Sequence, residues 1–247
     1  MSKPTLIFAP GAWYPPTAFD PLIAKLPDYT CHIIAFPAVQ QATTVTDLQL
    51  DISAVRTLVE QEADAGRDVV IVLHSWAGLP VSSALGGLSK QARTKAGKEG
   101  GVVKLVFIAA FVPEVGESLL DAFGGQAEWM IRDIENGTVT ASDPFNRFFH
   151  DVPDGHEWTK TLRPHAWAAK TSPATGAAYL EIPNSYLLCE DDRAILLAAQ
   201  EAMVERARSK GAVFETERIK AAHTPWLVPE VMGEVVGYIR RQAGEVL

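Results

Sequence analysis

Apolar runs alternate with amphipathic segments along most of this 247-residue chain. The runs are rich in Val, Ile and Leu and end at Gly, Pro or polar residues, which is typical of buried strands. The segments between them repeat apolar residues every three or four positions, which predicts helices with one buried face. We therefore expect strands at 5–9, 31–36, 68–74, 102–111, 185–189 and 213–219, and helices at 17–26, from 46 to Gly66, from 79, at 195–210 and from 229.

Strands that are continuously apolar and alternate with helices indicate the α/β class, with a mostly parallel, doubly wound sheet covered on both faces. Ligands of such sheets bind at the carboxyl ends of the strands. Ser75 and the loops that follow Ala9 and Cys189 all lie at predicted carboxyl ends. We expect these three places to converge on one site.

One segment, 113–182, interrupts the alternation between 1–112 and 183–247. A structureless loop of that length is uncommon in a compact domain, so short helices are expected around 127–136, 143–150 and 156–162. A polar stretch at 89–101 is predicted to be a solvated loop, and the spacing of Thr46 and Gln49 predicts a capping box.

Ser75 lies at the tip of a predicted strand–turn–helix, where a tight turn exposes its hydroxyl over the end of the sheet. The helix that follows directs its amides and positive dipole end toward the same place. Residues 74–78 resemble the nucleophile elbow of α/β-hydrolases, in particular the small serine hydrolases of the plant methylesterase and hydroxynitrile-lyase type and their fungal relatives. Leu73 and Ala77 stand where the usual G-x-S-x-G pattern has glycine.

The resemblance implies a catalytic triad in the order Ser75, Asp192, His223. His223 matches the base, and Asp192, just before Arg193, matches the acid. Asp191 is the fallback for that role and Glu190 is less favoured.

The resemblance also implies an oxyanion hole and a lid. The backbone amides of Ala12 and Trp76 would hold the oxyanion, and residues 113–182 would form a helical cap over Ser75. The candidate substrate-binding side chains are Trp13, Trp129, Phe148, His165 and Trp167. For each of the aromatic residues, ordinary packing within the cap is an interpretation of at least equal weight, and His165 is a cap residue that could contact the substrate.

The formal net charge of −8 argues against a nucleic-acid or anionic-membrane partner. The first apolar run is too short for a signal peptide, and no run has membrane-spanning length. Cys31 and Cys189 are expected to be buried free thiols in a reducing compartment, so we expect a cytoplasmic protein. No phosphate-binding glycine loop or metal-ligand spacing is present in the sequence, so neither a cofactor nor a metal is expected.

These observations predict a cofactor-free serine hydrolase that cleaves an ester, thioester or lactone of a small to medium hydrophobic substrate. One alternative is a non-hydrolytic lyase, isomerase or cyclase that uses His223 as its base. Cyanohydrin cleavage is disfavoured, because Gly11 and Thr224 occupy the positions where hydroxynitrile lyases have a hydroxyl residue and a lysine. The other alternative is a protein that binds a hydrophobic ligand, and a homodimer is left open.

Overall fold

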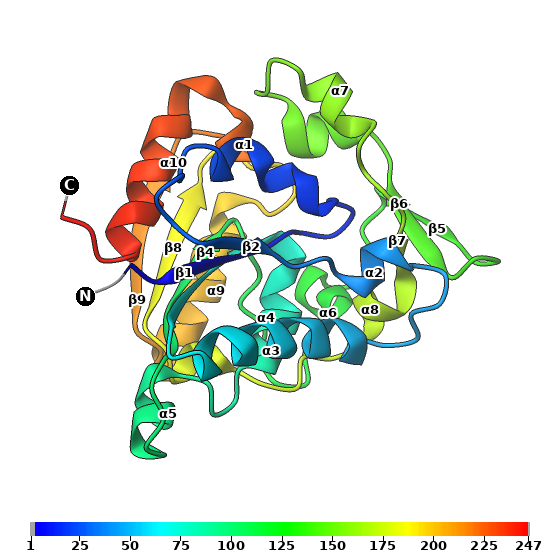
Figure 1. Cartoon of the computed structure of the whole chain (residues 1–247). Helices are drawn as coiled ribbons and strands as arrows, with labels where there is room; N and C mark the ends of the chain where they lie inside the picture. Colours follow the sequence, from blue (N-terminus) through cyan, green and yellow to red (C-terminus); the bar gives the residue numbers. More distant parts are fainter. Residues whose placement is uncertain (1–2, 247) are drawn as a thin grey trace.

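The computed structural model describes residues 3–246 of the chain. Six parallel strands form its central sheet in the order β2-β1-β3-β4-β8-β9 (Figure 1). This arrangement confirms the predicted α/β class and parallel sheet. The strands are β1 (Thr5–Ala9), β2 (Cys31–Ile33), β3 (Asp68–His74), β4 (Gly101–Ile108), β8 (Asn184–Cys189) and β9 (Phe214–Ile219).

Helices cover both faces of this sheet (Figure 1). Helices α1 (Asp20–Ile23) and α10 (Pro229–Gln242) lie on one face, and α3 (Gln49–Asp64), α4 (Gly78–Ala84) and α9 (Leu197–Ser209) lie on the other. The apolar stripe of α3 explains its placement, because Ile52, Val55 and Val59 are all buried. A short helix that the sequence did not predict, α2 (Pro37–Gln40), follows β2.

The segment between β4 and β8 mixes helices with a second, antiparallel sheet. Its helices are α6 (Leu119–Phe123), α7 (Gly155–Thr159) and α8 (Trp167–Thr171), and its strands, in the order β5-β6-β7, are β5 (Met130–Asp133), β6 (Thr138–Ala141) and β7 (His165–Ala166). A π-helix, Phe145–Phe149, and α7 lie where two short helices were expected. The helix expected at 127–136 is wrong, because a hairpin turns at Gly137 with a φ of 63°.

Two other local predictions are wrong. The stretch predicted as a loop at 89–101 contains α5 (Lys90–Lys95), whose N-cap Ser89 accepts a hydrogen bond from the Ala92 amide at 3.1 Å. The predicted capping box is absent, because α3 begins at Gln49, whose own amide donates to Asp47 Oδ1 at 2.8 Å.

The interior of the sheet is apolar, as the runs of Val and Ile predict. Every residue of β1 is buried. Leu73, the departure from the elbow pattern, is fully buried on β3, where it pairs with Ala9 of β1. Cys31 is half-buried and Cys189 is buried, and both are free thiols. Burial raises the pKa of the Cys31 thiol to about 11 and that of Cys189 well above its usual range.

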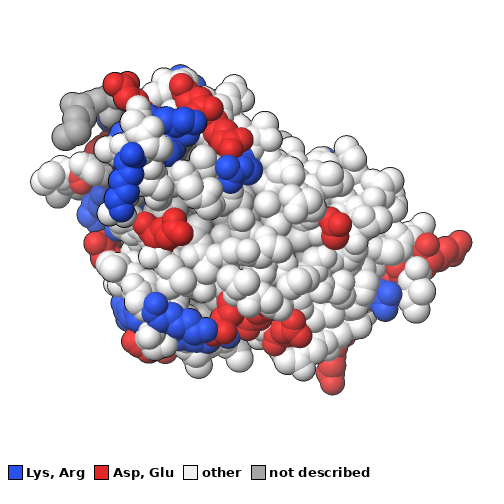
Figure 2. Space-filling view, turned by 90° about the horizontal axis from the view of Figure 1, so that it is seen from below, with Lys and Arg blue, Asp and Glu red and all other residues white. Residues whose placement is uncertain are grey.

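Charged side chains of both signs gather at one end and one edge of the face in Figure 2, and the middle of that face carries almost none. No helix between residues 3 and 246 is both long enough and apolar enough to cross a bilayer.

Candidate active site

Ser75 lies directly after β3, in a strained backbone conformation. It begins a 3₁₀ turn, Ser75–Ala77, that continues into α4, and its φ is 56°. A positive φ is costly for a residue with a Cβ and persists only where the surrounding structure enforces it. Here the Phe111 amide donates to the Ser75 carbonyl at 3.0 Å, and a Cβ on Gly78 would lie 1.8 Å from the Phe111 carbonyl oxygen. The segment after β4 therefore packs against both sides of the turn.

His223 and Asp192 form a buried pair. Nδ1 of His223 donates to Asp192 Oδ2 at 2.7 Å, and both side chains are almost fully buried. The other carboxylate oxygen, Oδ1, accepts from the amides of Ala194 at 2.7 Å and Ile195 at 3.0 Å. The carboxylate is therefore fixed from both sides and can hold the imidazole in one tautomer, with Nε2 free of a proton.

The neighbouring acids make no such contact. Glu190 is exposed and lies 3.5 Å from Arg218. Asp191 is exposed too, and its backbone amide donates to the Ala221 carbonyl. Of the three acids, the structure places only Asp192 against His223.

The loop that carries Asp192 is closed by a buried glutamine. The Gln200 side-chain amide, on α9, donates to the carbonyls of Cys189 at 3.0 Å and Ile195 at 2.7 Å. Its oxygen accepts from the Cys189 amide at 3.0 Å. One side chain thus joins the end of β8 to the far end of the loop.

The loop after β1 lies against Ser75. A Cβ on Gly11 would come within 2.9 Å of the Ser75 Cβ and 2.8 Å of His74 Nδ1, so only glycine permits this approach. Trp13, two residues on, has a φ of 72°. Its indole donates to the Val139 carbonyl at 2.8 Å, and its own carbonyl accepts from the Arg163 amide at 2.9 Å. The segment between β4 and β8 therefore holds this loop in place.

His74 connects the serine strand to the His223 loop. Its Nε2 donates to the His223 carbonyl at 2.9 Å, and the two rings lie 4.4 Å apart. Burial, more than the nearby His223, lowers the pKa of His74 well below its usual value. Among residues 3–246 no hydrogen bond joins the Ser75 hydroxyl to the His223 imidazole.

A small space, which we call the inner chamber, lies over Ser75. Its free volume is about 10 Å³, roughly the space of one water molecule. Five of the residues proposed from the sequence line it with Ser75, namely Ala12, Trp13, Trp76, Trp129 and Phe148.

Two other candidates lie away from the inner chamber. The His165 ring packs 4.5 Å from Trp76, and Trp167 lies under the Arg132 guanidinium. The structure therefore does not bring His165 or Trp167 to the chamber wall.

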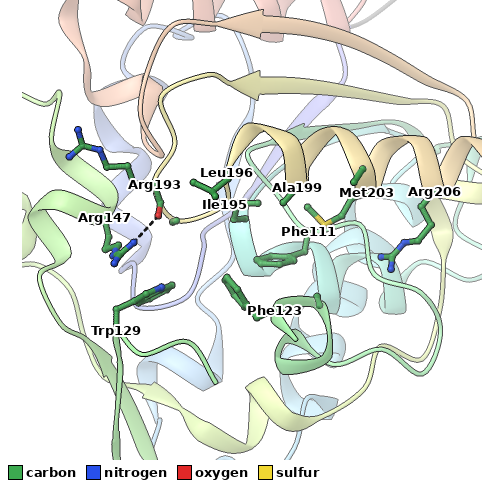
Figure 3. Close-up of a pocket in the computed structure, with 13 residues that line it drawn as sticks. Phe111, Phe123, Trp129, Arg147, Arg193, Ile195, Leu196, Ala199, Met203 and Arg206 are labelled. Atoms are coloured by element: carbon green, nitrogen blue, oxygen red, sulfur yellow. Dashed lines mark hydrogen bonds between the residues drawn. The ribbon is translucent and has the colours of Figure 1, made fainter. Parts of the chain in front are cut away.

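A larger space of about 490 Å³ adjoins the inner chamber, and we call it the outer cavity (Figure 3). The two spaces share five lining residues, Phe111, Phe123, Trp129, Ala194 and Ile195. Beyond them the outer cavity is bounded by α9, with Met203 in its wall, and by Arg147, Arg193 and Arg206. The sequence analysis did not predict this cavity, because no pattern in the sequence indicates that Phe123 and α9 lie on opposite sides of one space.

Lys170 is a second feature that the sequence did not reveal. It is completely buried, its Nζ lies 3.8 Å from the Trp13 ring centroid, and it has no hydrogen-bond partner. Burial lowers the pKa of this amine well below its usual range.

Comparison with known proteins identifies the family of this chain. The sequence profile described as the alpha/beta hydrolase family matches residues 6–235. The chain belongs to the α/β hydrolase family. The predicted resemblance is thereby confirmed.

Two fungal relatives match over nearly their whole length. The chain is 31% identical to the probable hydrolase R7 of Phoma sp., covering 96% of this chain and 98% of that protein. It is 30% identical to the α/β hydrolase nvfD of Aspergillus novofumigatus, covering 100% of this chain and 99% of that protein.

Solved structures share the fold at lower identity. The pyrethroid hydrolase PytH superposes with a TM-score of 0.73 at 17% identity, covering 97% of both chains. Polyneuridine aldehyde esterase superposes with a TM-score of 0.71 at 17% identity, covering 96% of this chain and 100% of that one.

Proposed function

We propose that this α/β hydrolase is a serine hydrolase that cleaves a carboxylic ester, thioester or lactone of a small to medium hydrophobic substrate. The observation that carries the proposal is the buried Asp192–His223 pair, 2.7 Å from oxygen to nitrogen. The backbone carbonyl of His223 is bonded to His74, the residue before Ser75. The apolar and aromatic walls around Ser75 support a hydrophobic substrate. The names of the two fungal relatives support a hydrolase in general.

In the proposed reaction the Ser75 hydroxyl turns toward His223 Nε2 and transfers its proton there as its oxygen attacks the carbonyl carbon. Hydrogen bonds of this kind often form only once substrate is bound, which accounts for the missing contact. Asp192 stabilises the resulting imidazolium. His223 then returns the proton to the departing alcohol or thiol, and an acyl-enzyme remains. Water attacks that ester with His223 again as base, and the acid leaves.

The amides of Ala12 and Trp76 are proposed to bind the oxyanion. Trp76 lies in the first turn of a helix, where an amide has no acceptor within the helix. Ala12 belongs to the loop that Gly11 brings against Ser75. Two amides that converge beside the reacting carbon contribute through charge stabilisation in the transition state.

We further propose that residues 113–182 act as a cap on a core formed by 1–112 and 183–247. Leu119 lines the inner chamber from the start of this region, and Trp129 and Phe148 line it from within the region. The cap would exclude bulk water while the acyl-enzyme forms.

The test is intact-mass measurement after treatment with a fluorophosphonate, with hydrolysis of p-nitrophenyl butyrate alongside. We expect one adduct and ester turnover in the wild type, and neither in Ser75→Ala. Ser82→Ala is the matched control, because Ser82 is another buried serine on the following helix. A wild type without adduct or turnover would contradict the proposal, as would an adduct that persists in Ser75→Ala.

One observation favours a second candidate. Since no hydrogen bond joins Ser75 to His223, the histidine is free to act alone as a base, as in a lyase or isomerase. That candidate predicts an activity that survives Ser75→Ala and is lost in His223→Ala.

A further inference from the structure

The inner chamber is too small for a whole substrate. Its free volume of about 10 Å³ holds about one water molecule. The outer cavity, at about 490 Å³, falls within the usual range for sites that bind small molecules. Because Phe123, Trp129 and Ile195 line both spaces, a molecule whose reacting group lies at Ser75 would extend past them into the outer cavity.

The two ends of the outer cavity differ in charge. At one end the Arg206 guanidinium is neutralised, because it donates to both Glu117 carboxylate oxygens at 2.8 Å and to the Val112 carbonyl at 3.0 Å. At the other end Arg147 donates only to the Arg193 carbonyl, at 3.3 Å (Figure 3). Among residues 3–246 no carboxylate lies within ion-pair distance of Arg147 or Arg193.

Arg147 lies between an aromatic ring and a backbone oxygen. Its guanidinium is 5.8 Å from the Trp129 ring centroid, and Trp129 is a shared wall of the two spaces. A guanidinium has five N–H donors, so most of them remain free to bind an anion. In a chain of net charge −8, this is an uncompensated cation at the edge of an apolar cavity.

We propose that the outer cavity binds the acyl chain of an elongated apolar ester whose far end carries a carboxylate, and that Arg147 binds this carboxylate. Arg193 adds positive charge at the rim. The assignment rests on the proposed hydrolase function and names its substrate class, a half-ester of a medium-chain dicarboxylic acid. The apolar walls bind the methylene chain, and the paired Arg206 leaves the other end without net attraction for an anion.

The test compares monomethyl suberate with methyl octanoate, which have acyl chains of equal length and differ by one carboxylate. We expect wild-type kcat/KM to favour monomethyl suberate by about 10-fold or more, the usual contribution of a hydrogen-bonded charge pair. Arg147→Gln removes this preference by raising KM for monomethyl suberate much more than KM for methyl octanoate. Arg241→Gln, which removes the same charge on α10 where Arg241 pairs with Glu217, keeps the preference.

Two outcomes would overturn the assignment. One is a wild type that favours methyl octanoate. The other is an Arg147→Gln variant that slows both esters equally, which would indicate a structural role. Wild-type enzyme in 0.5 M NaCl provides a check without a variant, because screening should raise KM for monomethyl suberate alone.

Calorimetric titration of Ser75→Ala with the same two esters separates this assignment from the proposed function. Suppose that neither ester is turned over, and that monomethyl suberate still binds and loses affinity in Ser75→Ala/Arg147→Gln. The hydrolase proposal then fails and the carboxylate site stands. If both esters are turned over at the same rate, without any preference for the carboxylate, the hydrolase proposal stands and the carboxylate site fails.

Discussion

The inner chamber and the outer cavity share a wall but are built from different parts of the molecule. The chamber is formed around loops at the carboxyl ends of β1 and β3, and two residues at its wall, Trp13 and Ser75, have positive φ. The outer cavity lies between α9 and the segment that follows β4, with arginines at its ends. The difference suggests that the reaction rate is set in the chamber and substrate choice in the cavity.

The largest effect on activity is expected from a substitution beside the inner chamber, at Asp192. Asp192→Asn is expected to lower kcat by about 10³–10⁴-fold for neutral and charged esters alike, because an amide beside His223 Nδ1 favours the wrong tautomer. Steady-state kinetics on both esters would measure this. Asp191→Asn is the matched control and should stay within about 2-fold of wild type, since Asp191 makes no side-chain contact with His223. The reverse ranking would assign the acid to Asp191.

The second-largest effect is expected on the stability of the turn at Ser75, which Gly78 allows to pack against Phe111. Gly78→Ala should destabilise the fold by about 3 kcal/mol or more, because the added methyl would meet the Phe111 carbonyl oxygen at 1.8 Å. Urea denaturation followed by circular dichroism measures it. Gly233→Ala, on α10 with open space around it, should instead be neutral or stabilise by about 0.5–1 kcal/mol. An unchanged urea midpoint for Gly78→Ala would mean that the turn can shift to accept the added methyl group, and would contradict a rigid turn.

Lys170 contacts the Trp13 ring and does not line the chamber. Lys170→Met should stabilise the fold by about 1–3 kcal/mol at pH 7, because the wild type must bury an amine that has no hydrogen-bond partner. The folded-state pKa lies below the unfolded value of 10.5, so this cost declines as the pH rises toward 10.5. Denaturation should show a smaller difference in stability between Lys170→Met and the wild type at pH 10 than at pH 7. A difference that stays constant would contradict a buried neutral amine.

The smallest effect is expected on chain-length preference, from a substitution at Phe123 in the wall that the two spaces share. Phe123→Ala should open the passage between the two spaces and raise kcat/KM for long-chain over short-chain esters by about 3–10-fold. A series of p-nitrophenyl esters measures the ratio. Phe145→Ala is the control, since Phe145 stacks on His156 at 3.9 Å and lines neither space. If both variants shift the ratio equally, the wall does not separate the two spaces.

Much of the core could be predicted from the sequence, because a strand such as β1 or β3 is buried on both faces and leaves an unbroken apolar run. The candidates Ser75, Asp192 and His223 came from the resemblance to α/β-hydrolases, and each of them follows a recognisable strand. The hairpin of β5 and β6 was missed although Asn136–Gly137 is a common hairpin-turn sequence; here it lies within a four-residue connection, 134–137.

The outer cavity had no comparable signal. It depends on how Phe123 and Trp129 pack against α9, a contact between segments far apart in the sequence that follows no periodic pattern. Lys170 was equally hidden, because a lysine at a helical position is normally exposed. Tertiary packing alone determines both.

The Gln200 side chain holds the loop after β8 by its backbone, so the position of Asp192 does not depend on the exposed side chains of that loop. Arg193 and Leu196 are both exposed and both border the outer cavity. Substitution of either residue would therefore leave the position of Asp192 unchanged. Descendants of this enzyme could change their substrate by replacing these two residues while the carboxylate beside His223 stays in place.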